Sequence, residues 1–265
     1  MTRILTVLAL VALPIAAAAA EPPSLARARA LYNSASYDAA IDAATMARLD
    51  PKAEDAAALV LARAHLERFR ATGGAADLTA ARAALAAVRT TALSPRDQLD
   101  QLIGLGQTLY FSEAFGAAAD VFDSALGRAS ILNARDRGKL LDWWATALDR
   151  QAQARPPDRR LSAFTRIVDR METELRNEPG SVIANYWLVV AARGAGDLDR
   201  SWDAAVAGWV RASLGSDAAD LRAELDRVVS DALIPERART RPQREQQEAA
   251  AAMRAEWEKA KADWK

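Results

Sequence analysis

The chain has 265 residues, equal numbers of basic and acidic residues, no cysteine and a single histidine. The balanced charge gives no electrostatic reason to expect nucleic acid as a partner. The lack of cysteine excludes disulfides, thiolate nucleophiles and cysteine metal sites. One histidine, His65, is too few for a histidine metal site or a Ser/His/Asp triad. We therefore expect no cofactor, no metal and no enzymatic activity.

The N-terminus has the pattern of a secretory signal. Arg3 precedes an uncharged apolar run over residues 4–16, and small residues at 18–20 stand directly before Glu21. The run contains a proline and is shorter than the ~20 residues of a spanning helix. We expect residues 1–20 to be a signal peptide that is cleaved after Ala20, which leaves a periplasmic or secreted product. A permanent N-terminal anchor is the alternative.

Apolar residues then recur at helical spacing in pairs of segments separated by short polar, Gly-containing or Pro-containing turns. Ser94 followed by Pro95 is the pattern of a helix N-cap and first helical residue. The predicted fold class is all-α, with about five helical hairpins. Their predicted ranges are 25–32 with 37–49, 53–70 with 78–88, 96–112 with 115–128, 135–153 with 159–177, and 182–193 with 198–214.

The third hairpin carries a distinctive pattern, with Leu102, Leu105, Gly106 and Leu109 on the first helix, then Phe115, Ala118, Phe122 and Ala125 on the second. This pattern resembles a tetratricopeptide repeat (TPR). Small residues at Gly106 and Ala118 allow close helix crossing. The first hairpin repeats the pattern, and the fifth does so more loosely, because Val189 replaces a small residue and predicts a splayed pair. The resemblance implies a TPR-like solenoid over residues 21–233 that binds a protein partner.

The resemblance also selects candidate residues for a partner-binding groove. In a TPR array, residues on the first helix of each hairpin that face away from the second helix line the inner surface. Carried onto this chain, these are Arg29, Tyr32, Arg63, Leu66, Ile103, Gln107, Tyr110 and Phe111. Tyrosine and arginine are typical of binding hot spots. Phe111 has an alternative role as filler between hairpins.

Two further side chains have competing interpretations. We expect His65 to be a packed, hydrogen-bonded core residue, because no second histidine or cysteine could complete a site with it. Trp143 and Trp144 are adjacent and therefore about 100° apart around a helix. Both are expected in the core of a helical array, whereas an exposed Trp143 would indicate a binding surface.

The C-terminal region departs from the hairpin pattern. An apolar stripe over residues 217–233 predicts a capping helix, and Ile234-Pro235 predicts a break that begins a linker and an amphipathic helix over 234–265. Met253, Trp257 and Trp264 fall on one face of that helix. This face either packs back on the domain or forms a second surface for a partner or a membrane.

Two functional hypotheses follow from the sequence. The first is a non-enzymatic scaffold or adaptor in the bacterial cell envelope that binds a protein along the concave repeat surface. The second is a helical protein of the periplasm that binds a small molecule or lipid. A cavity lined mainly by apolar residues would favour the second hypothesis, and a continuous polar and aromatic groove would favour the first.

Overall fold

The computed structural model describes residues 21–215 and 218–264, and every regular element within these ranges is helical. The predicted signal peptide, residues 1–20, lies outside the described residues. No helix in the described part of the chain is both long enough and apolar enough to cross a membrane. The predicted all-α fold class is confirmed.

The helices follow the predicted pairs to within a few residues. Ser94 accepts a hydrogen bond from the Asp97 amide and Pro95 begins the next helix, as the sequence predicts. The bounds are α1 (Pro23–Asn33), α2 (Tyr37–Ala47), α3 (Glu54–Thr72), α4 (Ala75–Ala86), α5 (Pro95–Phe111), α6 (Phe115–Leu126), α7 (Ala134–Gln153), α8 (Leu161–Asn177), α9 (Val182–Gly194), α10 (Leu198–Arg211), α11 (Ala218–Val228), α12 (Ile234–Arg239) and α13 (Gln246–Asp263).

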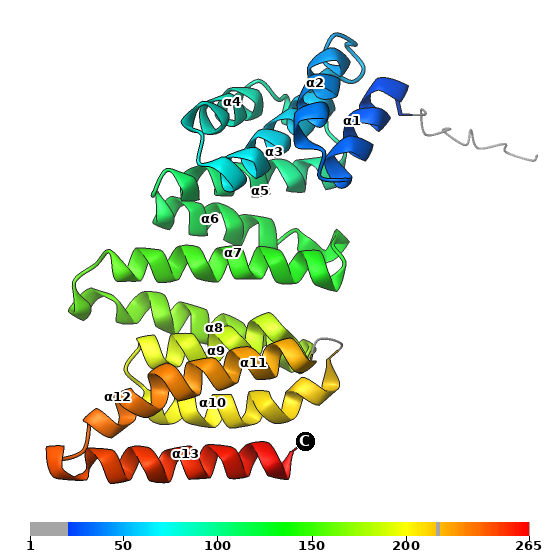
Figure 1. Ribbon diagram of the computed structural model, residues 1–265. Coiled ribbons are helices and arrows are strands. Elements are labelled where there is room, and N and C mark those ends of the chain that lie inside the picture. The colour runs from blue at the N-terminus through cyan, green and yellow to red at the C-terminus, as the bar shows by residue number, and fades with distance from the viewer. Residues whose placement is uncertain (1–20, 216–217, 265) are drawn as a thin grey trace, which may run out of the picture.

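The helices stack in chain order, and their connections alternate between the two sides of the stack (Figure 1). Each helix from α1 to α10 packs against the next one along the chain. In addition, α1 contacts α3 and α3 contacts α5, while α7 contacts α9 and α9 contacts α11. The odd-numbered helices therefore form a layer of their own, backed by the even-numbered helices.

Three turns between paired helices have the same backbone geometry. Ala35, Glu113 and Gly196 each adopt a left-handed conformation, with φ of 57°, 61° and 81°. The residue after each of them donates a backbone hydrogen bond to the carbonyl five positions earlier, which satisfies a free carbonyl at the helix end. These bonds are Ser36 to Leu31, Ala114 to Leu109 and Asp197 to Ala192, each 3.0 Å long. The first, third and fifth hairpins thus share one turn design.

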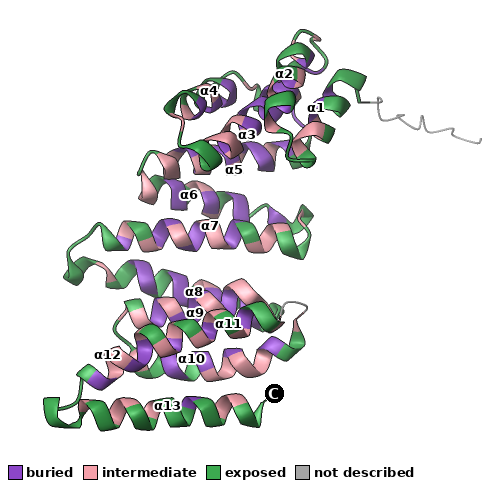
Figure 2. Ribbon diagram, in the orientation of Figure 1, coloured by how far each residue is buried: buried purple, intermediate pink, exposed green. Residues whose placement is uncertain are grey.

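Buried residues lie on the inner faces of the helices along the whole stack (Figure 2). They form two clusters, one from Leu25 to Leu93 and one from Leu99 to Trp257. Glycines allow close packing within the second cluster. A Cβ added to Gly106 would lie 2.5 Å from the ring of Phe122, and one added to Gly194 would lie 2.5 Å from the ring of Phe164. The core therefore forms between neighbouring helices along the array instead of around one centre.

The expected splaying of the fifth hairpin is wrong. Val189 on α9 and Ser201 on α10 are both completely buried. The Ser201 hydroxyl donates a 2.9 Å hydrogen bond to the Val189 carbonyl. A small hydroxyl residue on α10 therefore compensates for the larger valine on α9, and the two helices pack closely.

The predicted break at Ile234-Pro235 is also wrong, because the chain continues there as helix α12. A π-helical turn, η5 (Val229–Leu233), joins α11 to α12, and the Ile234 amide bonds to the Val229 carbonyl five residues back. Proline is tolerated in the first turn of a helix, where its missing N–H is not needed. Ile234 itself is completely buried in the main core.

Candidate functional site

A cavity of about 570 Å³ opens on the layer of odd-numbered helices. Its walls come from four helices, α1, α3, α5 and α7. Tyr32 lies at the end of α1, and Leu132 comes from the connection between α6 and α7. The residues from α3 are Arg63, Glu67 and Arg70, those from α5 are Arg96, Asp100, Ile103, Gly104, Gln107 and Tyr110, and those from α7 are Asp136, Lys139, Leu140, Asp142, Trp143 and Thr146. We call this cavity and its lining residues the groove.

Aromatic rings form one part of the groove. Tyr110 and Trp143 meet edge to face with their ring centroids 5.1 Å apart, which joins α5 to α7. The guanidinium of Arg70 lies 5.8 Å from the Trp143 ring centroid and also pairs with Glu67 at 2.8 Å. Such partly exposed aromatic rings offer a large, rigid contact area at small entropic cost.

Arg63 forms the wall between α1 and α5. Its guanidinium lies 4.5 Å from the Tyr32 ring centroid and donates a 2.8 Å hydrogen bond to Asp100. Burial raises the pKa of the Tyr32 hydroxyl. Burial by itself would lower the pKa of Arg63, but the neighbouring Tyr32 and Asp100 outweigh it and raise that pKa. Arg63 is therefore a permanent, fixed positive charge in the groove.

The remaining charged side chains at the α5 and α7 end of the groove are also paired. Arg96 lies 3.4 Å from Asp100 and 3.6 Å from Asp136, and Lys139 lies 3.7 Å from the other oxygen of Asp136. Asp142 accepts a 2.8 Å hydrogen bond from the indole N–H of Trp187. The groove thus combines fixed polar groups with little net charge, so its electrostatics do not select a strongly acidic or strongly basic ligand.

Five of the eight predicted groove residues line the cavity, namely Tyr32, Arg63, Ile103, Gln107 and Tyr110. The assignment of Leu66 to the groove is wrong, because Leu66 is 1% exposed. It lies three positions from Arg63 and close to Gly104 on α5, but its side chain is covered and belongs to the core.

Arg29 and Phe111 lie outside the cavity lining. Arg29 donates hydrogen bonds of 2.9 and 3.0 Å to the two oxygens of Asp97, and so joins α1 to the start of α5. Phe111 packs against Phe69 with tilted rings whose centroids are 4.9 Å apart, and it meets Trp143 edge to face at 5.7 Å. Phe111 therefore fills the space between neighbouring hairpins, as the alternative interpretation held.

The sequence interpretation missed the rest of α3 and, apart from the alternative role given to Trp143, the contributions of α7. Glu67 and Arg70 stand four and seven positions after Arg63, so helical periodicity could have placed them on the same face. Lys139, Trp143 and Thr146 follow the same spacing on α7.

The predicted second partner face on α13 is wrong in its central residue. Trp257 is 1% exposed and packs against Trp202 and Trp209, with centroids 6.2 and 5.4 Å away. Its indole N–H donates a 2.7 Å hydrogen bond to Asp226 on α11. Met253 is partly buried on the same stripe, and Trp264 is 55% exposed at the end of the helix. The stripe therefore covers the end of the array.

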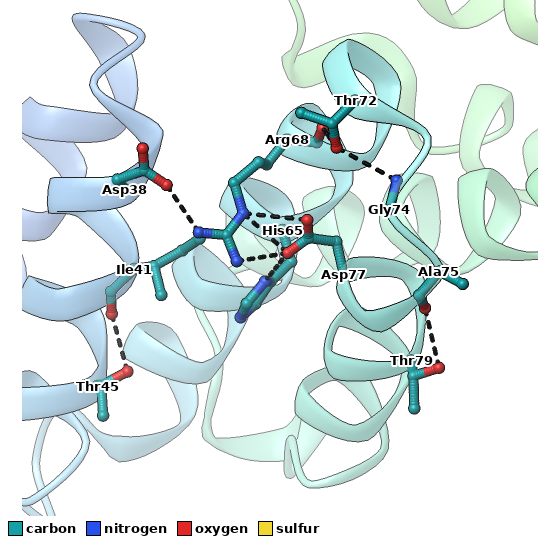
Figure 3. Close-up of polar contacts among 10 residues, drawn as sticks. All are labelled: Asp38, Ile41, Thr45, His65, Arg68, Thr72, Gly74, Ala75, Asp77 and Thr79. Atoms are coloured by element: carbon teal, nitrogen blue, oxygen red, sulfur yellow. Dashed lines mark hydrogen bonds and ion pairs between the residues drawn. The ribbon is translucent and has the colours of Figure 1, made fainter.

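His65 takes part in a polar network that joins three helices (Figure 3). Its Nδ1 lies 2.7 Å from Asp77 on α4, and Arg68 donates hydrogen bonds to the same carboxylate and to Asp38 on α2. The hydrogen bonds from Arg68 lower the pKa of Asp77. No cluster of side chains suited to a metal ion occurs in residues 21–215 and 218–264. The network links α2, α3 and α4 through polar contacts, so its role is structural.

Comparison with known proteins finds no match to a family model, to a curated protein or to a solved structure. The function is therefore inferred from the residues and geometry of this chain.

Proposed function

We propose that the chain is a TPR-like helical solenoid that acts as a non-enzymatic scaffold or adaptor in the bacterial cell envelope. It binds an extended segment of a protein partner in the groove. The proposal includes export by residues 1–20 and a periplasmic or secreted location, on the strength of the sequence pattern alone.

Two structural features support the TPR-like part of the proposal. The turns at Ala35, Glu113 and Gly196 have the same conformation and the same hydrogen bonds. Each of them stands seven positions after the helix-crossing residue of its first helix, which is Ala28 in the first hairpin, Gly106 in the third and the larger Val189 in the fifth. The layer of odd-numbered helices also corresponds to the inner layer of a repeat array.

The observation that carries the binding proposal is the composition of the groove. It combines Tyr32, Tyr110 and Trp143 with paired arginines, acids and the amide of Gln107. Polypeptide ligands need both aromatic contact area and hydrogen-bonding groups for their backbone. A small-molecule or lipid pocket would be more enclosed and mainly apolar, so the groove favours the protein partner over the alternative hypothesis.

The proposal is tested by site-specific photo-crosslinking in the native cell. A benzophenone amino acid at Gln107, in the groove, is expected to yield a defined adduct with a partner protein. The matched control places it at Ser124, which is exposed on α6 in the even-numbered layer. Adducts of equal yield from both positions, or none from Gln107, would reject the groove as the binding surface.

A further inference from the structure

Two arginine-rich connections lie on the same side of the stack. Residues 154–160, between α7 and α8, contain three arginines and one aspartate. Residues 237–245, from α12 to the start of α13, contain four arginines and one glutamate. Both segments lie on the side where α9 turns into α10 (Figure 1).

Side-chain contacts connect the two segments through that turn. Gly194, at the end of α9, packs on the ring of Phe164 in the first turn of α8. Arg193 lies 3.4 Å from Glu236, and Arg237 lies 2.6 Å from Asp199 in the first turn of α10. Residues 154–160, with Leu161 after them, and residues 237–245 therefore flank the α9–α10 turn on one side of the stack (Figure 1), and we call this side the basic edge.

The positive charge of the basic edge is poorly neutralised within the chain. Arg155, Arg239 and Arg241 are exposed, and none of them forms an ion pair with any residue that the structure describes. Among the described residues, Arg159 pairs with Asp158 alone, at 4.0 Å, whereas Arg237 pairs with Asp199 and Arg244 with Glu245. In the groove, by contrast, the arginines are paired. The edge therefore has a local positive charge although the chain is neutral as a whole.

An exposed apolar side chain lies within this charged surface. Leu161, directly after Arg159 and Arg160, is 56% exposed at the start of α8. Arginine binds phosphate oxygens through several N–H groups at once. A leucine that directly follows two arginines suits the boundary between headgroups and acyl chains, whereas a phosphodiester backbone offers nothing to an isolated leucine.

We propose that the basic edge docks the protein on a phospholipid bilayer that carries anionic headgroups. The arginines contact headgroup phosphates and Leu161 enters the interface. This surface is separate from the groove and from the Trp257 stripe, so the bound bilayer leaves the groove free for its protein partner.

The test is cosedimentation of the purified chain with two kinds of vesicle. One contains phosphatidylcholine alone, and the other contains phosphatidylcholine with about 30% of the anionic lipid phosphatidylglycerol. All variants keep the same N-terminus, so that residues 1–20 contribute equally. Each basic side chain near an anionic surface strengthens binding roughly fivefold. The triple variant Arg155→Gln, Arg239→Gln, Arg241→Gln is expected to lose on the order of 100-fold in affinity for the anionic vesicles. Leu161→Ser is expected to weaken binding at every salt concentration.

A matched triple variant, Arg27→Gln, Arg128→Gln, Arg176→Gln, removes the same charge from exposed positions away from the edge. It is expected to bind as the unmodified chain does, and its melting curve and that of the edge variant should coincide with wild type. Equal losses in the two triple variants would overturn the proposal, as would equal binding to neutral and anionic vesicles. Tighter binding to a DNA oligonucleotide than to anionic vesicles, abolished by the edge variant, would assign the edge to nucleic acid and also overturn it.

Discussion

Replacing Gly106 tests the closest helix contact in the array. A Cβ added there would lie 2.5, 2.7 and 2.9 Å from three ring carbons of Phe122. Phe122 is completely buried among Ala118, Ala119 and Ala125, so its ring has no free space to enter. The substitution Gly106→Ala must therefore push α5 and α6 apart or force Phe122 from its rotamer.

Two opposing effects set the size of the change in stability. Overpacking of a buried site costs about 1–3 kcal/mol. Alanine in a helix interior is favoured over glycine by about 0.5–1 kcal/mol. We expect a net destabilisation of about 1–2 kcal/mol for Gly106→Ala, and more for Gly106→Leu. For a domain of this size, each 1 kcal/mol lowers the melting temperature by about 2–4 °C.

Gly104 on the same helix provides the matched control. A Cβ at Gly104 would meet only the terminal methyl groups of Leu85, at 3.3 and 3.5 Å, and Leu66 at 3.9 Å. Because these distances need a shift of only a few tenths of an ångström in a flexible side chain, we expect Gly104→Ala to be neutral or slightly stabilising through helix propensity. Thermal and urea unfolding followed by circular dichroism measure both variants.

The double variant Gly106→Ala, Phe122→Leu separates the steric effect from other causes. If the ring is the obstacle, the two substitutions together should cost less than the sum of the single substitutions. Wild-type stability for Gly106→Ala, or an equal loss for Gly104→Ala, would refute the close contact between α5 and α6.

Three further predictions follow from the turns and polar contacts. Glu113 is exposed with φ of 61°, a left-handed conformation that glycine adopts without strain. Glu113→Gly should therefore increase the free energy of unfolding by up to about 1 kcal/mol and raise the melting temperature. A lower melting temperature would contradict this. The Arg68 hydrogen bonds lower the pKa of Asp77. The extra stability of wild type over Asp77→Asn should therefore be complete above the unfolded-state pKa, near 4, and decrease as pH falls from there toward the lower folded-state pKa. Urea unfolding of both proteins between pH 6 and pH 3 measures this difference, and a difference that does not change with pH would contradict the prediction. Asp226→Ala removes the acceptor of the buried Trp257 indole N–H, and the unsatisfied donor costs about 1–3 kcal/mol of stability. Hydrogen exchange of the α13 amides should become roughly tenfold faster or more, while exchange in α5 stays the same. Unchanged exchange in α13 would show that this hydrogen bond does not hold the helix in place.

Much of the fold follows from local sequence signals. Ser94-Pro95 begins a helix where predicted, since capping depends only on residues three or four apart. The predicted start of the helix at 198 also holds, and Asp197 caps it. The Ile234-Pro235 prediction failed for a different reason. Proline disfavours a helix locally, but the burial of Ile234 in the core and the preceding π-helical turn stabilise α12.

The groove was partly predictable because helical periodicity assigns residues to faces. Tyr32, Arg63 and Tyr110 were placed correctly on that basis. Periodicity does not show where the boundary between a buried and an open face lies, and Leu66 fell on the wrong side of it. Trp143 lines the groove beside Tyr110 of α5, and the two rings are in contact although the residues are 33 positions apart in the chain. Local periodicity does not contain such a long-range contact.

The sequence by itself determined the helical class, the positions of most helices and the need for glycine at Gly106, because propensity, capping and periodicity act over a few neighbouring residues. Only the tertiary structure decided which faces are covered. Trp257 is amphipathic and suits either a partner or the core, and it became core because Trp202, Trp209 and Asp226 form a site for it on α10 and α11. Burial of a side chain depends on which distant helix packs against it, and local sequence patterns do not contain that information.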